Sequence, residues 1–383
     1  LTWDGVAWSE PVSLTDDQQP DFAPMVAFDG NGHGLVVWER SNLAPEITPS
    51  MDITFARSLE IAASAWDGES WSEPVVLTDN DLMDHAPRLA AGSDGTVMAL
   101  WHTGDGTDIV GTADHPLTLT YALWDGNGWS APAPALTGLR DVVNVAFALR
   151  SATQAALVYA QDTDGDLSTT ADTELFYSTY DGTAWSQPVR LTDDAIPDGV
   201  PALAYDAAGA LHLVWLRGGD PSTGSGRALV WLRDSWNVAD ARTVRAESTA
   251  GGFLGFTFTR DPNGNLALVW QSMGPEGADL TYSIYDAAAD DWSADLSLMS
   301  DAAVEASHSP AFGGDGTLYL AYQKVATELV TRTIEISPTL SYTVTNLPQP
   351  GQSDLAFLQH TVGRDLTLDS FTIAPANPAP GQP

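Results

Sequence analysis

A short acidic run at residues 161–174 carries the clearest local signal for chemistry. Its carboxylates alternate with other residues at Asp162, Asp164 and Asp166. Such spacing can bring several hard oxygen atoms to one point, which is the environment that Ca²⁺ prefers. The run does not follow the EF-hand pattern, because its glycine stands at the fourth position instead of the sixth. We expect a Ca²⁺ site here, with a solvated acidic turn as the alternative. The expected ligands are Asp162, Asp164, Asp166, Asp172 and Glu174.

A second acidic loop follows the strand that ends near Trp101. Asp105, Asp108 and Asp114 are a second candidate set for a cation. The histidines do not cluster along the sequence, and we interpret them as structural residues near strand ends. The three that stand at such places are His85, His102 and His308.

Candidate ligand-binding residues stand where apolar strands run into long, uneven loops. These loops span residues 39–52, 102–116, 161–174 and 217–227, and many of their residues are acidic. The turns at the other strand ends are short and uniform, and function on a repeated scaffold tends to lie in the variable loops. We call the four long loops the acidic loop face and expect a protein or glycan ligand there. The expected ligand-binding residues are Glu39, Arg40, His102, Arg217 and Gln271.

The charge of the chain excludes one class of partner. The 383 residues carry a formal charge of −36, and Lys324 is the only lysine. Nucleic acid is therefore excluded as a partner, because phosphate binding needs clustered lysine and arginine. No apolar run approaches the ~20 residues that span a bilayer, so we expect no membrane insertion. The chain contains no cysteine, so no disulfide holds the fold.

The elements that must position these residues are repeated hairpins. One hairpin contains Trp-Asp-Gly followed by Trp-Ser, as in residues 120–137, where Trp124 and Trp129 face each other across a tight turn. We interpret these tryptophans as packing residues of the hairpin. The unit returns about every 50–60 residues, a period typical of propellers and other arrays. Its turn aspartates are Asp4, Asp67, Asp125, Asp181, Asp234 and Asp286.

A second hairpin, apolar on both strands, separates the copies of the first, as in residues 200–217. Four antiparallel strands per repeat indicate a propeller blade. We therefore predict an all-β protein, a seven-bladed β-propeller of four-stranded antiparallel blades spanning residues 1–374, with six blades as the alternative. In the seven-bladed arrangement, residues 353–374 pair with residues 1–15 to close the ring. Residues 375–383 are rich in proline and are expected to lead into a further domain.

The Trp-Asp-Gly-x-x-Trp-Ser unit resembles the bacterial neuraminidase repeat (BNR), or sialidase-like, propeller families. The usual Asp-box reads Ser-x-Asp-x-Gly-x-x-Trp, whereas here Asp67 and Gly68 are adjacent. Sialidase activity would imply an Arg-Ile-Pro segment and an arginine triad. No such segment occurs, and the arginines, Arg88 among them, are scattered. Residues 365–383 also resemble the start of a CARDB-type adhesion module, which implies a longer, secreted or cell-surface polypeptide.

The main functional prediction is an extracellular or cell-surface binding and adhesion module. It would be non-catalytic, with Ca²⁺ stiffening its loops. The alternative is a glycan-active hydrolase or lyase that uses acidic residues at the mouth of the central channel. Two close carboxylates, one of them protonated at neutral pH, would favour the enzyme.

Overall fold

The computed structural model describes most of the chain as antiparallel strands. Its described residues contain two short helices, α1 (Ile53–Ala56) and η1 (Val238–Asp240). None of the described helices has the length and hydropathy needed to cross a membrane. The described residues are 7, 9–30, 32–43, 53–169, 171–218, 226–246, 253–261, 264–273, 278–298, 304–313, 316–337, 340–362 and 368–373.

The chain divides into two compact units, which are described separately. The first contains Leu1–Tyr205, His212–Gly218 and Leu232–Ala241. The second contains the rest of the chain, most of it within Arg242–Pro383.

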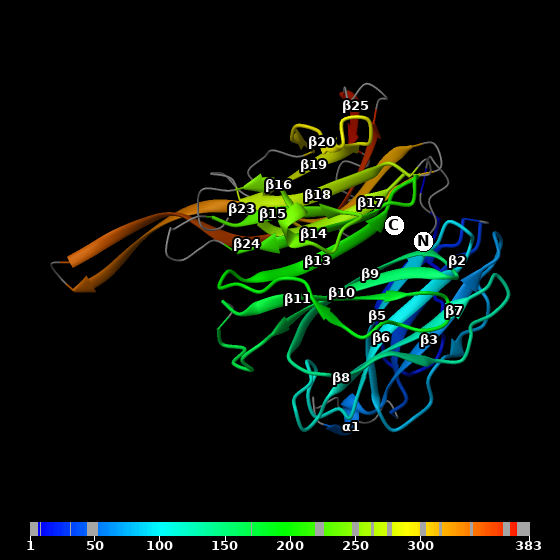
Figure 1. Cartoon of the computed structure of the whole chain (residues 1–383). Helices are drawn as coiled ribbons and strands as arrows, with labels where there is room; N and C mark the ends of the chain where they lie inside the picture. Colours follow the sequence, from blue (N-terminus) through cyan, green and yellow to red (C-terminus); the bar gives the residue numbers. More distant parts are fainter. Residues whose placement is uncertain are drawn as a thin grey trace. The chain divides into compact units, whose positions relative to one another are not determined.

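Each repeat of the first unit folds into a four-stranded antiparallel sheet, with the strands paired in chain order (Figure 1). In two of these sheets the second strand is the most buried one, and Val97–His102 are all buried. This confirms the predicted all-β fold of propeller blades. The three complete sheets are β1 (Asp21–Phe28), β2 (Gly34–Ser41), β3 (Leu59–Trp66) and β4 (Val75–Val76); β5 (Met83–Ala91), β6 (Val97–Gly104), β7 (Leu117–Trp124) and β8 (Ala133–Leu139); and β9 (Val142–Ser151), β10 (Gln154–Asp162), β11 (Thr173–Tyr180) and β12 (Val189–Arg190).

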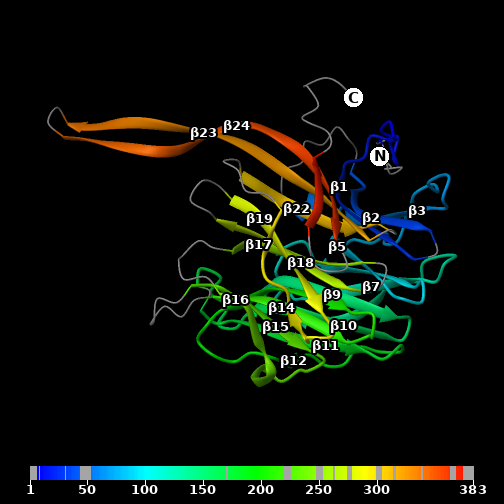
Figure 2. The ribbon, with the colours of Figure 1, turned by 90° about the horizontal axis from the view of Figure 1, so that it is seen from above.

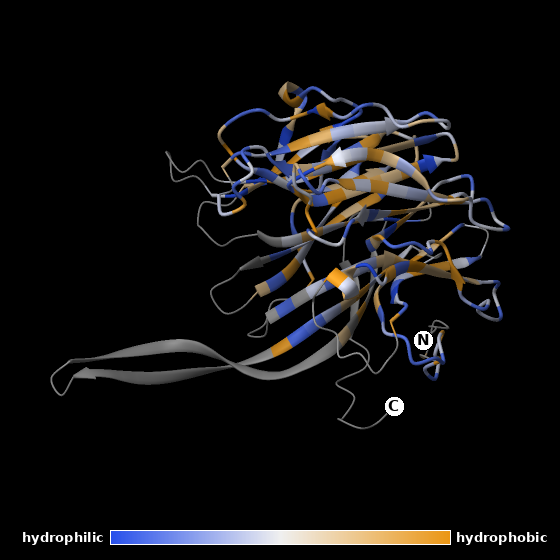
Figure 3. Ribbon diagram, turned by 90° about the horizontal axis from the view of Figure 1, so that it is seen from below, coloured by the Kyte–Doolittle hydropathy of each residue, from blue (hydrophilic) through white to orange (hydrophobic). Residues whose placement is uncertain are grey.

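The core lies between successive sheets, because each sheet has apolar side chains on both faces. Val37 and Ile61 of the first sheet pack against Trp101 and Ala122 of the second. A larger cluster joins the second and third sheets and includes Leu157. In Figure 3 the hydrophobic residues gather along the strands, while many connecting loops are hydrophilic. Sheets covered on both sides explain why the inner strands read as nearly continuous apolar runs.

The Trp-Asp-Gly hairpin at residues 120–137 forms as expected. Trp124 and Trp129 are bridge partners with ring centroids 5.7 Å apart. Asp125 closes the turn because its Oδ1 accepts hydrogen bonds from the backbone amides of Asn127 and Gly128 at 2.9 and 3.1 Å. The aromatic pairs are therefore packing elements of the blade, as the sequence predicted.

The turn glycines of two equivalent hairpins differ in what surrounds them. Gly126 and Gly182 have φ angles of 95° and 93°, a backbone region that disfavours side chains. A Cβ on Gly126 would meet nothing within 4 Å, whereas one on Gly182 would lie 2.9 Å from Cα of Thr153.

We therefore expect Gly182→Ala to destabilise the protein more than Gly126→Ala does. The strained φ should cost about 1 kcal/mol in both variants. The clash with Thr153 should add roughly 1–3 kcal/mol to the loss in Gly182→Ala alone. Urea unfolding of the two variants measures the difference, and equal losses would contradict the role of the contact.

The remaining repeats form further antiparallel sheets. One has the order β13-β14-β15-β16. Within the second unit, the strands β17–β19 and β22–β25 form one continuous sheet, and a single apolar cluster contains residues from both parts, among them Val269 and Leu320. The strands are β13 (Asp198–Tyr205), β14 (Leu211–Arg217), β15 (Ala228–Arg233), β16 (Arg242–Ala246), β17 (Phe253–Arg260), β18 (Leu266–Met273), β19 (Ala278–Asp286), β20 (Asp291–Trp292), β21 (Leu296–Ser297), β22 (Val304–Phe312), β23 (Thr317–Ser337), β24 (Leu340–Val362) and β25 (Leu368–Ile373).

The C-terminal strands differ from the expected pairing of residues 353–374 with 1–15. Residues 353–362 belong to β24 and pair with β23, and β25 pairs with β24. The physical reason is that β23 and β24 continue past the sheet as a long two-stranded ribbon (Figure 2). The outer strands of this sheet therefore come later in the sequence than in the other repeats.

The blade number stays a prediction, because parts of the segments that would complete the ring lie outside the described residues. Of the opening segment, only residues 7 and 9–15 are described, and they contain no strand. Residues 374–383, which include the predicted linker, are outside the described part as well.

Candidate functional site

A carboxylate at the start of the first strand anchors the tryptophan of the second strand in three repeats. The indole Nε1 of Trp101 donates to Asp84 at 2.9 Å, and both residues are buried. The residue two positions after the tryptophan joins the same group: Thr103 in one repeat and Arg217 in another donate to the anchoring aspartate. We call this group the carboxylate–tryptophan tether. Its donor–acceptor pairs, always 17 residues apart, are Trp38–Asp21, Trp101–Asp84 and Trp215–Asp198.

The backbone is strained two residues after these acids. Ala23, Ala86 and Val200 have positive φ angles of 46°, 52° and 49°, although none is glycine. The first strand also shifts register next to Ala23 and Ala86. Non-glycine residues in this region are costly and tend to mark functional or tightly held sites. The tether therefore holds a bulge at the start of these strands.

Two histidines and an arginine meet at the bulge of the second sheet. His85 of β5 and His102 of β6 are cross-strand partners, with ring centroids 5.1 Å apart in an edge-on arrangement. Nε2 of His85 and both ring nitrogens of His102 are buried without a hydrogen-bond partner among the described residues. Arg88 lies nearby and donates from Nη1 to the carbonyl of Ala86 at 2.9 Å. We call His85, Arg88 and His102 the imidazole–guanidinium cluster.

Burial sets the charge state of this cluster. Burial, helped by the nearby charge of Arg88, lowers the pKa of His85 to about 4 and that of His102 to about 3. Burial also lowers the pKa of Arg88, which nevertheless stays protonated because free arginine titrates above pH 12. Within the described part of the chain, Arg88 forms no ion pair with a carboxylate. The cluster thus presents two neutral imidazoles beside one positive charge.

The five predicted ligand-binding residues make different local contacts, and their shared role stays a prediction. Glu39 accepts from the backbone amide of Ala86 at 2.7 Å, and burial raises its pKa. Arg40 binds Asp17 and Gln19. Gln271 donates to the backbone carbonyl of Glu305. The remaining two are His102, in the cluster just described, and Arg217, which is bonded to Asp194 and Asp198.

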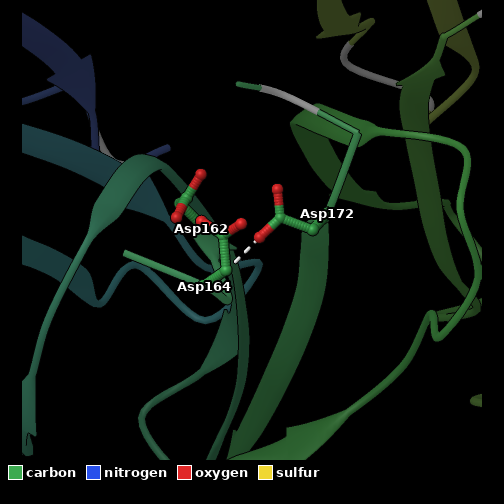
Figure 4. Close-up of side chains that lie close together, drawn as sticks. All are labelled: Asp162, Asp164 and Asp172. Atoms are coloured by element: carbon green, nitrogen blue, oxygen red, sulfur yellow. Dashed lines mark hydrogen bonds between the residues drawn. The ribbon is translucent and has the colours of Figure 1, made fainter. Parts of the chain in front are cut away.

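The predicted Ca²⁺ ligands divide into two groups. Asp162, Asp164 and Asp172 each place a carboxylate oxygen within 4.8 Å of the others (Figure 4). Asp166 is bonded to Ser168 instead, with its Oδ1 accepting from the Ser168 hydroxyl at 2.6 Å. Glu174 is fully buried and pairs with Arg190 at 3.1 Å.

The second candidate cation set is not assembled in the described residues. Asp105 pairs with His115 at 2.6 Å, and Oδ1 of Asp108 accepts from the amides of Val110 and Gly111. Asp114 does not join either of them in a group that could hold an ion.

Sequence reasoning gave no functional role to His85 and Arg88. The signal was only partly present, because the two strands pair about the turn at residues 92–96, and that register, in which Arg88 pairs with Leu100, would set His85 opposite Thr103, one residue from His102. A bulge after His85 shifts that register. Only alignment of the repeats, in which bulges recur at the same place, would have revealed the pairing.

Comparisons with known proteins show the fold. No family model matches the chain, and no curated protein matches it. Among solved structures, a protein of unknown function from Dyadobacter fermentans has 14% identity and a TM-score of 0.51, covering 81% of this chain and 92% of that chain. An ulvan lyase of polysaccharide lyase family PL25 has 14% identity and a TM-score of 0.50, covering 78% and 75%. At such identities the similarity concerns the fold alone.

Proposed function

We propose that the protein is a glycan-active enzyme that cleaves an acidic polysaccharide at the imidazole–guanidinium cluster. One observation carries the proposal: a guanidinium without a carboxylate partner lies beside two imidazoles whose buried nitrogens have no partner. An unpaired buried charge is unfavourable, so a bound anion would stabilise the site. The carboxylate of a uronic acid fits Arg88, because arginine binds carboxylates through paired hydrogen bonds.

The chemistry that suits these groups is β-elimination. Arg88 would neutralise the sugar carboxylate, which acidifies the neighbouring C5–H bond. The neutral imidazole of His85 would accept that proton, a double bond would form between C4 and C5, and the C4–O bond would break. The imidazolium would then return its proton to the departing oxygen. No oxidant or reductant is needed, and the residue His85 is partly exposed.

Two further points support this proposal over a non-catalytic adhesion module. One of the similar structures is a polysaccharide lyase, an ulvan lyase. Elimination also needs a neutral histidine as the base. Buried polar atoms normally have hydrogen-bond partners, so a purely structural role would not explain why the buried imidazole nitrogens have none. A polymeric substrate would also fit the expected secreted or cell-surface location, which remains part of the proposal.

The test is an activity screen with polyuronates, sulfated polyuronates and neutral polysaccharides. Elimination yields an unsaturated uronate that absorbs ultraviolet light, so absorbance and new reducing ends should rise together on an acidic polymer. Reducing ends without absorbance would show hydrolysis and contradict the elimination step. Binding on a glycan array without any cleavage would contradict the enzyme and favour the adhesion module.

A further inference from the structure

The third sheet lacks the carboxylate–tryptophan tether that its neighbours have. The equivalent positions hold Val142, Tyr159 and Gln161, at the same spacing as Asp84, Trp101 and Thr103 in the second sheet. None of the three can supply a carboxylate. The loop that leaves β10 in this sheet must therefore be held by other means.

Three aspartates converge where the tether is missing. Asp162 ends β10, and Asp172 immediately precedes β11. Their carboxylates and that of Asp164 gather at the mouth of the loop (Figure 4). Asp141 lies beside them, because its backbone carbonyl accepts from the amide of Asp162 at 3.0 Å. Within the described residues, none of the four carboxylates has a basic partner.

Asp162 provides independent evidence for a ligand. Its side chain is buried, with the residue only 1% exposed. Oδ1 accepts from the amide of Gly165 at 2.7 Å, but Oδ2 is buried without a partner in the described structure. Burying an ionised oxygen without a partner costs several kcal/mol. A cation at this point would satisfy that oxygen and offset the repulsion among the neighbouring carboxylates.

We propose that Asp162, Asp164 and Asp172 bind one Ca²⁺ ion, which takes the place of the missing tether. The donor set is entirely carboxylate, which selects hard cations over zinc or copper. Ca²⁺ binds oxygen at about 2.3–2.6 Å, so two of its ligands can lie nearly 5 Å apart. The carboxylate oxygens of the three aspartates lie within 4.8 Å of one another and so meet this condition. The bound ion joins the end of β10 to the start of β11 and so holds the loop between them.

Asp172 also organises the loop through direct hydrogen bonds. Its Oδ2 accepts from the backbone amides of Thr163 and Asp164 at 3.1 and 2.8 Å. Replacing it would disturb the loop with or without an ion. Asp162 and Asp164 are therefore the informative positions for substitution.

The test is calorimetric titration of the chelator-treated full chain with Ca²⁺, together with thermal unfolding. We expect binding to one site and a rise in Tm. Asp162→Asn and Asp164→Asn keep the shape of the side chain but should weaken the affinity roughly tenfold or more, since affinity follows the number of charged ligands. Absence of both heat and a Tm shift would overturn the proposal, as would tighter binding of Mg²⁺ than of Ca²⁺.

Asp166→Asn is the matched control, because it removes the same charge from the same loop. Asp166 is exposed and bonded to Ser168, outside the converging group. We expect it to retain Ca²⁺ affinity. Equal weakening in Asp166→Asn and Asp162→Asn would overturn the site by showing diffuse attraction to an acidic loop. The result is independent of the glycan proposal, because the imidazole–guanidinium cluster lies on other strands.

Discussion

Replacing His85 with glutamine should reduce turnover of the susceptible polyuronate by about 10²–10⁴-fold, the usual contribution of a general base. Glutamine keeps the approximate size of imidazole but cannot accept a proton at this pH. The loss should appear in kcat, with the far-ultraviolet spectrum unchanged. The acidic limb of the kcat/KM profile reports the pKa of the base in the free enzyme. We therefore expect that limb near pH 4 in the wild type.

Arg88→Lys and His115→Gln complete this experiment. Lysine keeps the charge but not the two-pronged geometry, so Arg88→Lys should raise KM for acidic polymers. His115 pairs with Asp105 and is not a member of the cluster, so its substitution should leave activity unchanged. Full activity in His85→Gln would place the reaction elsewhere on the protein.

The repeats could be predicted from the sequence because each blade is a local structure. The Trp-Asp-Gly turns depend on contacts between residues close in sequence, such as Asp125 with Asn127 and Gly128. The convergence of Asp162 and Asp164 was predictable for the same reason. Asp172 joins them because β10 and β11 pair up to Asp162 and Thr173, which brings the loop ends together.

The sequence was less informative about contacts between residues of different strands and loops. Glu174 was assigned to the Ca²⁺ loop, but the register of β11 turns it toward Arg190 and the backbone amide of Asp194. The carboxylate–tryptophan tether was also missed. The constant spacing of 17 residues is visible in the sequence. The hydrogen bond from the indole to the aspartate is not, because it forms across the hairpin between two different strands.

Acidification should destabilise the protein strongly through the buried histidine pair. In the unfolded chain, imidazoles take up protons as the pH falls below about 6.5. In the folded chain, His85 stays neutral until about pH 4 and His102 until about pH 3. The unfolded state therefore binds more protons in this range, and the free energy of unfolding decreases as the pH falls. At pH 5 each histidine should account for a loss of about 2 kcal/mol, or about 4 kcal/mol together.

The double variant His85→Gln/His102→Gln isolates this effect. Glutamine suits the second position, because Gln271 and Gln323 follow the equivalent aromatic residues of other repeats. Other groups near the pair also titrate: burial raises the pKa of Glu39 and Asp84, which favours the folded state on acidification. Those carboxylates and Arg88 are present in both proteins, so subtracting the two urea-unfolding series from pH 8 to 5 leaves the histidine contribution. The double variant should lose about 4 kcal/mol less than the wild type over that range. Parallel curves would mean that the imidazoles of the folded protein are hydrated, and therefore not the desolvated pair on which the proposed base depends.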